Sequence, residues 1–204
     1  MPLTMLENIN VNAHEYYLTT AQRVTNQLNP KRILKTDAMN EVHDGMPKLG
    51  GIAGNLQTNA TITIVEIDSA KKTKAQGLLA GRGFEIRLGD IRHLPCSDGW
   101  FDLVLDCSTL DHVPQEQMPM VLDEYKRVLQ DGGHAMIISW ASWGPGRYVT
   151  NNDGSCPPYY CCYFEYPVLT RAIEDRFEVV ERQRFYEDDN GFLTYFLVKK
   201  EEEK

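Results

Sequence analysis

Strand-like and helix-like segments alternate along the chain, and this alternation constrains the fold more than any other feature. Residues 61–68 (TITIVEID) and 134–140 (HAMIISW) are short runs of β-branched and apolar residues, typical of buried strands. Residues 115–133 place apolar side chains at helical spacing and end in a Gly-Gly pair. Parallel strands need crossover helices of this kind, so the pattern predicts an α/β fold.

The same criteria extend the pattern over the rest of the chain. Further helices are predicted at 13–28, 69–83 and 166–177, and further strands at 31–36, 84–90 and 101–107. The glycine-containing segment 41–59 gives only a weak helix signal. Two β-rich segments, 177–187 and 192–200, flank an Asn-Gly turn, the typical signal of a hairpin. We therefore expect a doubly wound, mostly parallel, seven-stranded sheet with helices on both faces and a C-terminal antiparallel hairpin.

The length of 204 residues suits a single domain spanning 1–204, which would begin with an N-terminal helical segment at 1–30. No segment has the pattern of a secretory signal or of a membrane span, which predicts a cytoplasmic protein. The net charge of −8 opposes binding to nucleic acid or to anionic lipid. Cys156, Cys161 and Cys162 have no nearby histidine and no regular zinc spacing, so we expect reduced thiols and no metal.

Carboxylates follow four of the predicted strands, at Asp37, Asp68, Asp90 and Asp106. In an open α/β sheet, ligands bind at the carboxyl ends of the strands. A rim of this kind suits a ligand that offers hydroxyls, an amine and a positive charge, and it suits a polyphosphate badly. The alternative is that these acids cap helices or close turns.

Three segments resemble the class I S-adenosylmethionine-dependent methyltransferases. GDIRHLPCSDGWFDLVLDCSTLDHVP (89–114) is similar to the family's third and fourth strands, and EYKRVLQDGGHAMIISW (124–140) to the following helix and fifth strand. IVEIDSA (64–70) resembles the second strand with its terminal acid. The resemblance covers about residues 31–140. It implies a Rossmann-like methyltransferase fold, S-adenosylmethionine as cofactor and methyl transfer to a small molecule.

The resemblance also implies roles for individual residues. Asp68 would accept hydrogen bonds from the ribose hydroxyls. Asp90 would bind the adenine amine, and the backbone N–H of Ile91 would bind an adenine ring nitrogen. The methionine portion or the sulfonium would be faced by Asp106 or by the backbone around Cys107 and Ser108, at the end of the fourth strand.

The acceptor would approach after the fourth strand, where His112 follows in LDHVP. A histidine titrates near neutrality and could act as a base, or it could simply pack under the aromatic segment that follows. Residues 141–165 form a long irregular segment that we expect to be a substrate-side loop. Four residues could contact the acceptor, although the aromatic ones could equally pack in the core: Asp111, Trp143, Arg147 and Tyr148.

The loop after the first strand departs from the family pattern of acid-x-Gly-x-Gly-x-Gly. It reads KTDAMNE (35–41), with Lys35 at the acid position and Asp37, Met39 and Glu41 at the glycine positions. Asp37 or Glu41 could pair with the methionine ammonium from a shifted position, which would give a divergent methyltransferase. Alternatively, the side chains fill the pocket and leave a catalytically silent binding or regulatory protein. An NAD-linked dehydrogenase would also need the missing glycines, to bind pyrophosphate.

Overall fold

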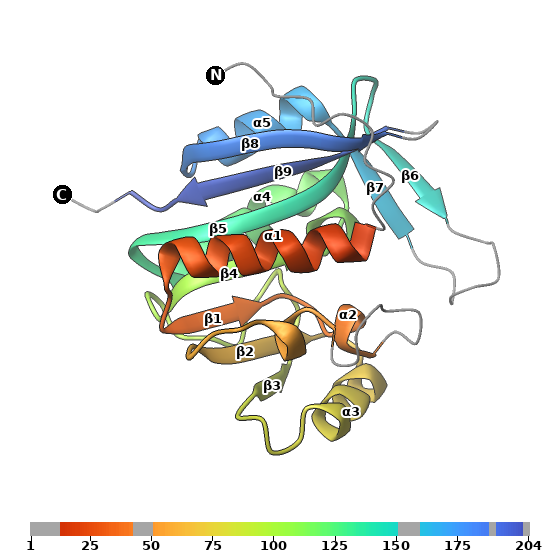
Figure 1. The fold of residues 1–204 in the computed structure, drawn as a ribbon. Helices are drawn as coiled ribbons and strands as arrows, with labels where there is room; N and C mark the ends of the chain where they lie inside the picture. The colour runs from red at the N-terminus through yellow and green to blue at the C-terminus, as the bar shows by residue number, and fades with distance from the viewer. Residues whose placement is uncertain (1–12, 43–50, 151–159, 188–190, 202–204) are drawn as a thin grey trace.

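A twisted, mostly parallel sheet forms the centre of the molecule (Figure 1). The computed structural model describes residues 13–42, 51–150, 160–187 and 191–201. Strands β1 to β5 run parallel to one another, in the spatial order β3-β2-β1-β4-β5. Their bounds are β1 Arg32–Lys35, β2 Thr61–Glu66, β3 Glu85–Leu88, β4 Phe101–Cys107 and β5 Leu129–Ser142.

The C-terminal hairpin predicted from the Asn-Gly turn is present. Strand β9 (Phe192–Lys199) pairs antiparallel with β5 from His134 to Ala141, and β8 (Glu178–Glu187) pairs with β9. The antiparallel edge on a parallel sheet confirms the predicted fold class.

The sheet has nine strands within the described residues rather than the seven predicted. The two additional strands, β6 (Arg147–Thr150) and β7 (Tyr160–Glu165), come from the segment that we expected to be an irregular loop. They pair antiparallel with each other, and β7 also pairs with the end of β5, Ala141 opposite Phe164. Tertiary pairing with an extended β5 therefore imposes strand structure where periodicity gave no signal. Cys156 lies outside the described residues, and the four described cysteines are free thiols.

Helices cover both faces of the sheet. On one face α4 (Met118–Val128) and α5 (Tyr166–Glu174) pack on residues such as Val104 and Ile137. On the other face α1 (Ala13–Leu28) and α3 (Ser69–Leu78) pack on residues such as Ile33 and Met136. The doubly wound arrangement follows from strands that are apolar on both sides.

Four predicted helices are shorter than expected. Helices α3 and α5 end at Leu78 and Glu174, before the predicted residues 83 and 177. The helix predicted at 115–133 starts with the 3₁₀ turn η3 (Gln115–Gln117) and ends at Val128, because Leu129 already pairs with Phe101 of β4. The weakly predicted helix at 41–59 is reduced to α2 (Met39–Val42) and the 3₁₀ turn η1 (Ala53–Asn55), with 43–50 outside the described residues. No helix in the described part of the chain has the length and apolarity that crossing a membrane would require.

The carboxyl ends of the parallel strands meet at one edge of the sheet, on the right in Figure 1. The loops after β1, β2, β3 and β4 all lie at this edge. The N-terminal end of α1, the turn η2 (Leu110–His112) and the β6–β7 hairpin approach it as well. This edge therefore gathers most of the side chains that the sequence singled out.

Candidate active site

The loop after β1 is organised around a buried lysine. Lys35 ends β1 with no exposed side-chain surface, and its Nζ donates to the Asp37 backbone oxygen (2.7 Å) and to Asp37 Oδ2 (3.1 Å). Glu41 Oε2 lies 3.1 Å from the same Nζ and forms an ion pair with it. Within the described residues, this oxygen accepts no hydrogen bond. We call Lys35, Asp37 and Glu41 the β1-loop cluster.

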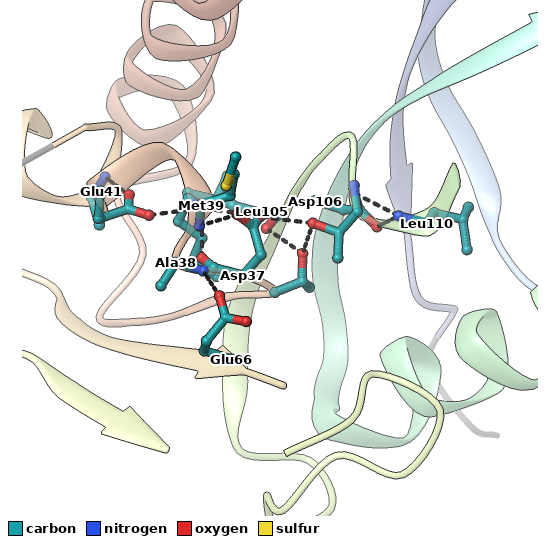
Figure 2. A network of polar contacts seen from close by, with 12 residues as sticks. Asp37, Ala38, Met39, Glu41, Glu66, Leu105, Asp106 and Leu110 are labelled. Atoms are coloured by element: carbon teal, nitrogen blue, oxygen red, sulfur yellow. Dashed lines mark hydrogen bonds and ion pairs between the residues drawn. The ribbon is translucent and has the colours of Figure 1, made fainter. Parts of the chain in front are cut away.

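The two acids of this cluster have further partners (Figure 2). Asp37 Oδ1 accepts from the Met39 N–H (2.7 Å), and Asp37 Oδ2 accepts from the Thr109 hydroxyl (2.7 Å). Glu41 Oε1 accepts from the Ala53 N–H (2.9 Å). The cluster therefore ties β1, α2 and η1 to the loop after β4.

The electrostatics of the cluster depend on the lysine. Burial alone would raise the pKa of Asp37, but the charge of Lys35 and the Thr109 hydroxyl hold it below its ordinary value. Burial raises the pKa of Glu41 despite the same lysine, and the pKa of Lys35 is raised by both acids against the cost of burial. Removing one partner of a buried ion pair typically costs about 3–5 kcal/mol, so these contacts are hard to exchange.

A glycine on the other side of this loop allows it to pack closely. Gly51 has φ +57°, and a Cβ placed there would lie 2.0 Å from the Asn40 backbone oxygen. A side chain at this position would therefore push the β1 loop away. Residues 50–54 (GGIAG) do not replace the missing glycines of the β1 loop, but Gly51 lets the chain pack against it.

A second buried acid, Asp106, lies beside the β1-loop cluster. Its carboxylate accepts from the Tyr125 hydroxyl and from the backbone N–H groups of Thr109 (2.8 Å) and Leu110 (3.1 Å). Burial raises the pKa of Asp106 to about 7, against these hydrogen bonds. Asp106 was predicted to face the cofactor, and the structure places it inside the protein, where it stabilises the turn after β4 and binds α4.

The acid at the end of β2 is Glu66, which sequence reasoning missed. Its Oε2 accepts from the Ala38 N–H (2.9 Å), as Figure 2 shows. Its Oε1 accepts from the Asp68 N–H (2.9 Å), so the carboxylate lies between the β1 loop and the start of α3. Asp68, the predicted ribose ligand, is exposed and is the N-cap of α3, accepting from the N–H groups of Ala70 and Lys71. Glu66 could have been found from the sequence. If Asp68 is recognised as the N-cap of α3, Glu66 is the last acid of β2.

Asp90 ends the loop after β3 and is paired at the surface. Its carboxylate accepts two hydrogen bonds from Arg92 Nε (2.9 and 3.0 Å), and its side chain is 27% exposed. The hydrogen bond from Arg92 lowers the pKa of Asp90. Ion pairs at this exposure are worth about 0–1 kcal/mol, so a ligand could share the carboxylate at little cost. Ile91, next in the chain, is buried.

The turn after β4 carries the acceptor-side candidates. Ser108 adopts φ +65° and its hydroxyl donates to Asp111 Oδ2 (2.9 Å), which also accepts from Cys161 Sγ of β7 (3.1 Å). Asp111 is buried, and burial raises its pKa. Tyr17 of α1 lies beside Asp111 and Ser108. Burial raises the pKa of Tyr17, the charge of Asp111 raises it further, and a hydrogen bond with Ser108 lowers it. Tyr17 could not be assigned here from sequence, because nothing in its helix pattern indicates a polar partner.

His112 and Cys107 flank this group in different environments. The side chain of His112 is exposed, and its backbone N–H donates to the Thr109 oxygen (3.0 Å). Cys107 is buried in the core beneath α1, where burial raises its pKa well above the ordinary value and keeps it a thiol. Of the two, His112 alone has a side chain that a ligand outside the core can reach.

The three predicted acceptor residues of the 141–165 segment lie in different places. Tyr148 is on the acceptor side, where its hydroxyl accepts from the Gln115 N–H (3.2 Å). Trp143 packs edge-on against Tyr166 of α5 (4.9 Å between ring centroids), toward the β8–β9 hairpin. Arg147 is exposed and its guanidinium lies over the Tyr163 ring (5.8 Å). Within the described residues, no group of three metal-ligating side chains could hold an ion.

The strand order of the sheet is that of the Rossmann-like methyltransferase fold. A family model described as a methyltransferase domain matches residues 49–137. No curated protein matches the chain. The matched part of the chain, together with the solved structures below, makes the protein similar to the class I S-adenosylmethionine-dependent methyltransferases, enzymes that use S-adenosylmethionine as cofactor.

Several solved structures share the fold over most of the chain. An S-adenosylmethionine-dependent methyltransferase from Methanosarcina mazei is 15% identical with a TM-score of 0.71, covering 88% of this chain and 98% of its own. The 1,6-didemethyltoxoflavin-N1-methyltransferase of Burkholderia thailandensis, with 1,6-didemethyltoxoflavin and S-adenosylhomocysteine bound, is 17% identical (TM-score 0.64; 97% and 94% covered). The N-methyltransferase NodS from Bradyrhizobium japonicum WM9, in complex with S-adenosylhomocysteine, is 15% identical (TM-score 0.67; 95% and 90% covered).

The two halves of the cofactor fit this edge unequally. The adenosyl half finds carboxylates that are exposed or cheaply shared, at Asp68 and Asp90, with Glu66 between them and the β1 loop. The methionine half would meet the β1-loop cluster, whose two carboxylates are already paired with Lys35. The residues present therefore fit the adenosyl half, and they do not offer Asp37 or Glu41 as free partners for an ammonium.

Proposed function

We propose that this protein is an S-adenosylmethionine-dependent methyltransferase that acts on a small-molecule acceptor, which binds beside η2 and the β6–β7 hairpin. The observation that carries this proposal is the position of the hairpin. Cys161 of β7 donates to Asp111 of η2, and the Glu165 N–H donates to Gln115 Oε1 (2.9 Å), so the hairpin lies directly against the turns after β4. A site flanked in this way suits a small acceptor better than a macromolecule.

Two further observations support a small acceptor. The net charge of −8 opposes a nucleic acid substrate. The toxoflavin-type methyltransferase from Burkholderia thailandensis, which is similar over 97% of this chain, binds a small molecule together with S-adenosylhomocysteine.

Each residue of the edge has a role in this proposal. Glu66 or Asp68 binds the ribose hydroxyls, and Asp90 with the Ile91 N–H binds the adenine. When bound, the cofactor supplies a methyl group on a cationic sulfur, and the site's task is to align an acceptor with it and exclude water. The acceptor is contacted by Tyr148 and Arg147, with Trp143 at the outer rim, and buried Asp111 positions the turn after β4 beside it. His112 takes a proton from acceptors that carry one.

The proposal is tested by incubating the protein with methyl-labelled cofactor and a panel of small amines, hydroxyl compounds and ring nitrogens. We expect label in at least one small molecule, together with S-adenosylhomocysteine. Glu66→Gln should reduce the transfer, whereas the matched control Glu85→Gln should not. Glu85 is an exposed residue at the start of β3, and it forms an ion pair with Arg87 of the same strand. Label found only in added protein or RNA would contradict a small acceptor.

A further inference from the structure

The β1-loop cluster contains Asp37 and Glu41, the two acids that the sequence analysis offered as partners of the cofactor's methionine ammonium. An ammonium group has three donors. Lys35 Nζ donates to the Asp37 backbone oxygen (2.7 Å) and to Asp37 Oδ2 (3.1 Å), and it forms an ion pair with Glu41 Oε2 (3.1 Å). The lysine thus makes the contacts that the sequence analysis had reserved for the ammonium of the cofactor.

The carboxylates of the cluster have little capacity left for a second cation. Asp37 is 16% exposed, and it accepts from Met39 and Thr109 in addition to Lys35. Glu41 has no exposed side-chain surface and also accepts from the Ala53 N–H. A second ammonium at this place would also be repelled by the charge of Lys35.

Lys35 cannot leave to make room for the cofactor. Its backbone belongs to the central strand β1, paired on one side with Ile64 of β2 and on the other with Leu105 of β4. Its side chain is fully buried, and without Asp37 and Glu41 its charge would remain in the interior unpaired. The ion pairs of the cluster are therefore a fixed part of the fold.

We propose that Lys35 is a built-in counterpart of the cofactor's ammonium, so that this protein binds S-adenosylmethionine without an ion pair from the methionine ammonium to Asp37 or Glu41. The inference rests on the proposed function, because it concerns the same cofactor at the same edge. Recognition then depends mainly on the adenosyl half, through Asp90 and through Glu66 or Asp68. Lys35 is a positioning residue, since it acts on the loop and does not touch the reacting atoms.

The first test compares two ligands on the wild-type protein by calorimetric titration. One ligand is S-adenosylhomocysteine, and the other is its analogue in which the amino group is replaced by hydrogen. We expect dissociation constants within about threefold of each other, because no carboxylate is waiting for the amino group. An analogue that binds more than about tenfold more weakly would overturn the inference.

The second test removes all three charges in the variant Lys35→Met/Asp37→Asn/Glu41→Gln. Replacing a whole buried ionic group by neutral residues of similar volume is often tolerated, so we expect a folded protein. Its affinity for S-adenosylhomocysteine should stay within about threefold of wild type, while Glu66→Gln weakens binding about tenfold or more. A folded triple variant that loses binding overturns the inference. If it does not fold, the ligand comparison on wild-type protein decides.

The two proposals fail in different ways. A wild-type protein that binds no S-adenosylhomocysteine would overturn the proposed function and the inference with it. Wild-type binding combined with a strong requirement for the amino group would overturn the inference alone and leave methyl transfer intact.

Discussion

The carboxyl edge of the sheet has two halves that handle charge differently. After β1 and β4 the acids are mostly or fully buried, and each accepts a hydrogen bond from a distant part of the chain, as in Asp37 with Thr109 and Asp106 with Tyr125. After β2 and β3 the acids at Asp68 and Asp90 are exposed or partly exposed, and their partners are within three residues in sequence. The first half is part of the fold's interior, and the second half is available to a ligand.

The difference shows that a carboxylate at a strand end is not by itself a binding group. Whether it can bind a ligand depends on the free energy needed to release it from its present partner. That cost is about 3–5 kcal/mol for a buried ion pair and about 0–1 kcal/mol for a surface pair. The four strand-end aspartates look equivalent in the sequence, and burial divides them into two classes.

The largest effect should come from removing the buried cation alone. Lys35→Met leaves Asp37 and Glu41 buried without their counter-ion, and we expect a loss of about 3–5 kcal/mol in the free energy of unfolding. The matched control is Lys71→Met on the surface of α3, which should change stability by less than about 0.5 kcal/mol. Denaturant titration measures both. A Lys35→Met protein as stable as wild type would break the distinction between the two halves.

The second effect concerns the pH dependence of stability through Asp106. Its pKa of about 7 in the fold lies above the ordinary value of 3.8, so the folded state holds the proton more strongly. Stability from this group is complete below about pH 4 and falls as pH rises toward about 7, by at most about 4 kcal/mol. In Asp106→Asn the dependence disappears, and the amide can keep the contacts with Tyr125 and Thr109.

The measurement is urea unfolding of both proteins at about pH 4, 5.5 and 7. The stability of Asp106→Asn relative to wild type should increase over this series. A constant difference would show that Asp106 is not a buried acid of this kind and would move it to the ligand-facing half.

The fold was predictable because its signals are local. The runs at 61–68 and 134–140, the apolar stripe of α4 and the Asn-Gly turn each determine their own structure, and the parallel order follows from the alternation. Strands β6 and β7 were not predictable, because they depend on pairing with a β5 that extends to Ser142, a contact with no periodic signature. The Gly-Gly pair predicted an end of α4 near residue 133. The helix ends earlier, at Val128, because Leu129 pairs with Phe101 of β4.

The site was predictable only as a set of strand-end acids. Asp37, Asp68, Asp90 and Asp106 all lie at the expected edge, but their burial depends on side chains from elsewhere, such as Tyr125 and Thr109. The role of Lys35 depends on its burial beside Asp37 and Glu41, which the sequence alone does not show. Glu66 was within reach, because recognising Asp68 as a helix cap leaves it as the last acid of β2.

A third prediction separates the two acids at the end of β2, of which Glu66 is buried and Asp68 is exposed. Glu66→Gln should weaken binding of S-adenosylhomocysteine by about tenfold or more, because it changes the carboxylate at the junction of β1 and β2. Asp68→Asn keeps an N-cap side chain on α3 and should weaken binding by less than about threefold. Calorimetric titration measures both variants, with Glu85→Gln as the surface control. The reverse order would restore Asp68 as the ribose ligand.

The smallest effect should come from the surface pair at the end of β3. Arg92→Gln removes the guanidinium from Asp90, and since the pair is 35% and 27% exposed, stability should change by less than about 1 kcal/mol. Without Arg92, Asp90 is free to bind the adenine amine, and the affinity for S-adenosylhomocysteine should rise about two- to threefold. The increase should be smaller at high salt. Titrations at low and high ionic strength measure this. A large loss of stability or of affinity would mean that Arg92 and Asp90 form a structural unit like the β1-loop cluster, and the two halves of the edge would no longer differ in kind.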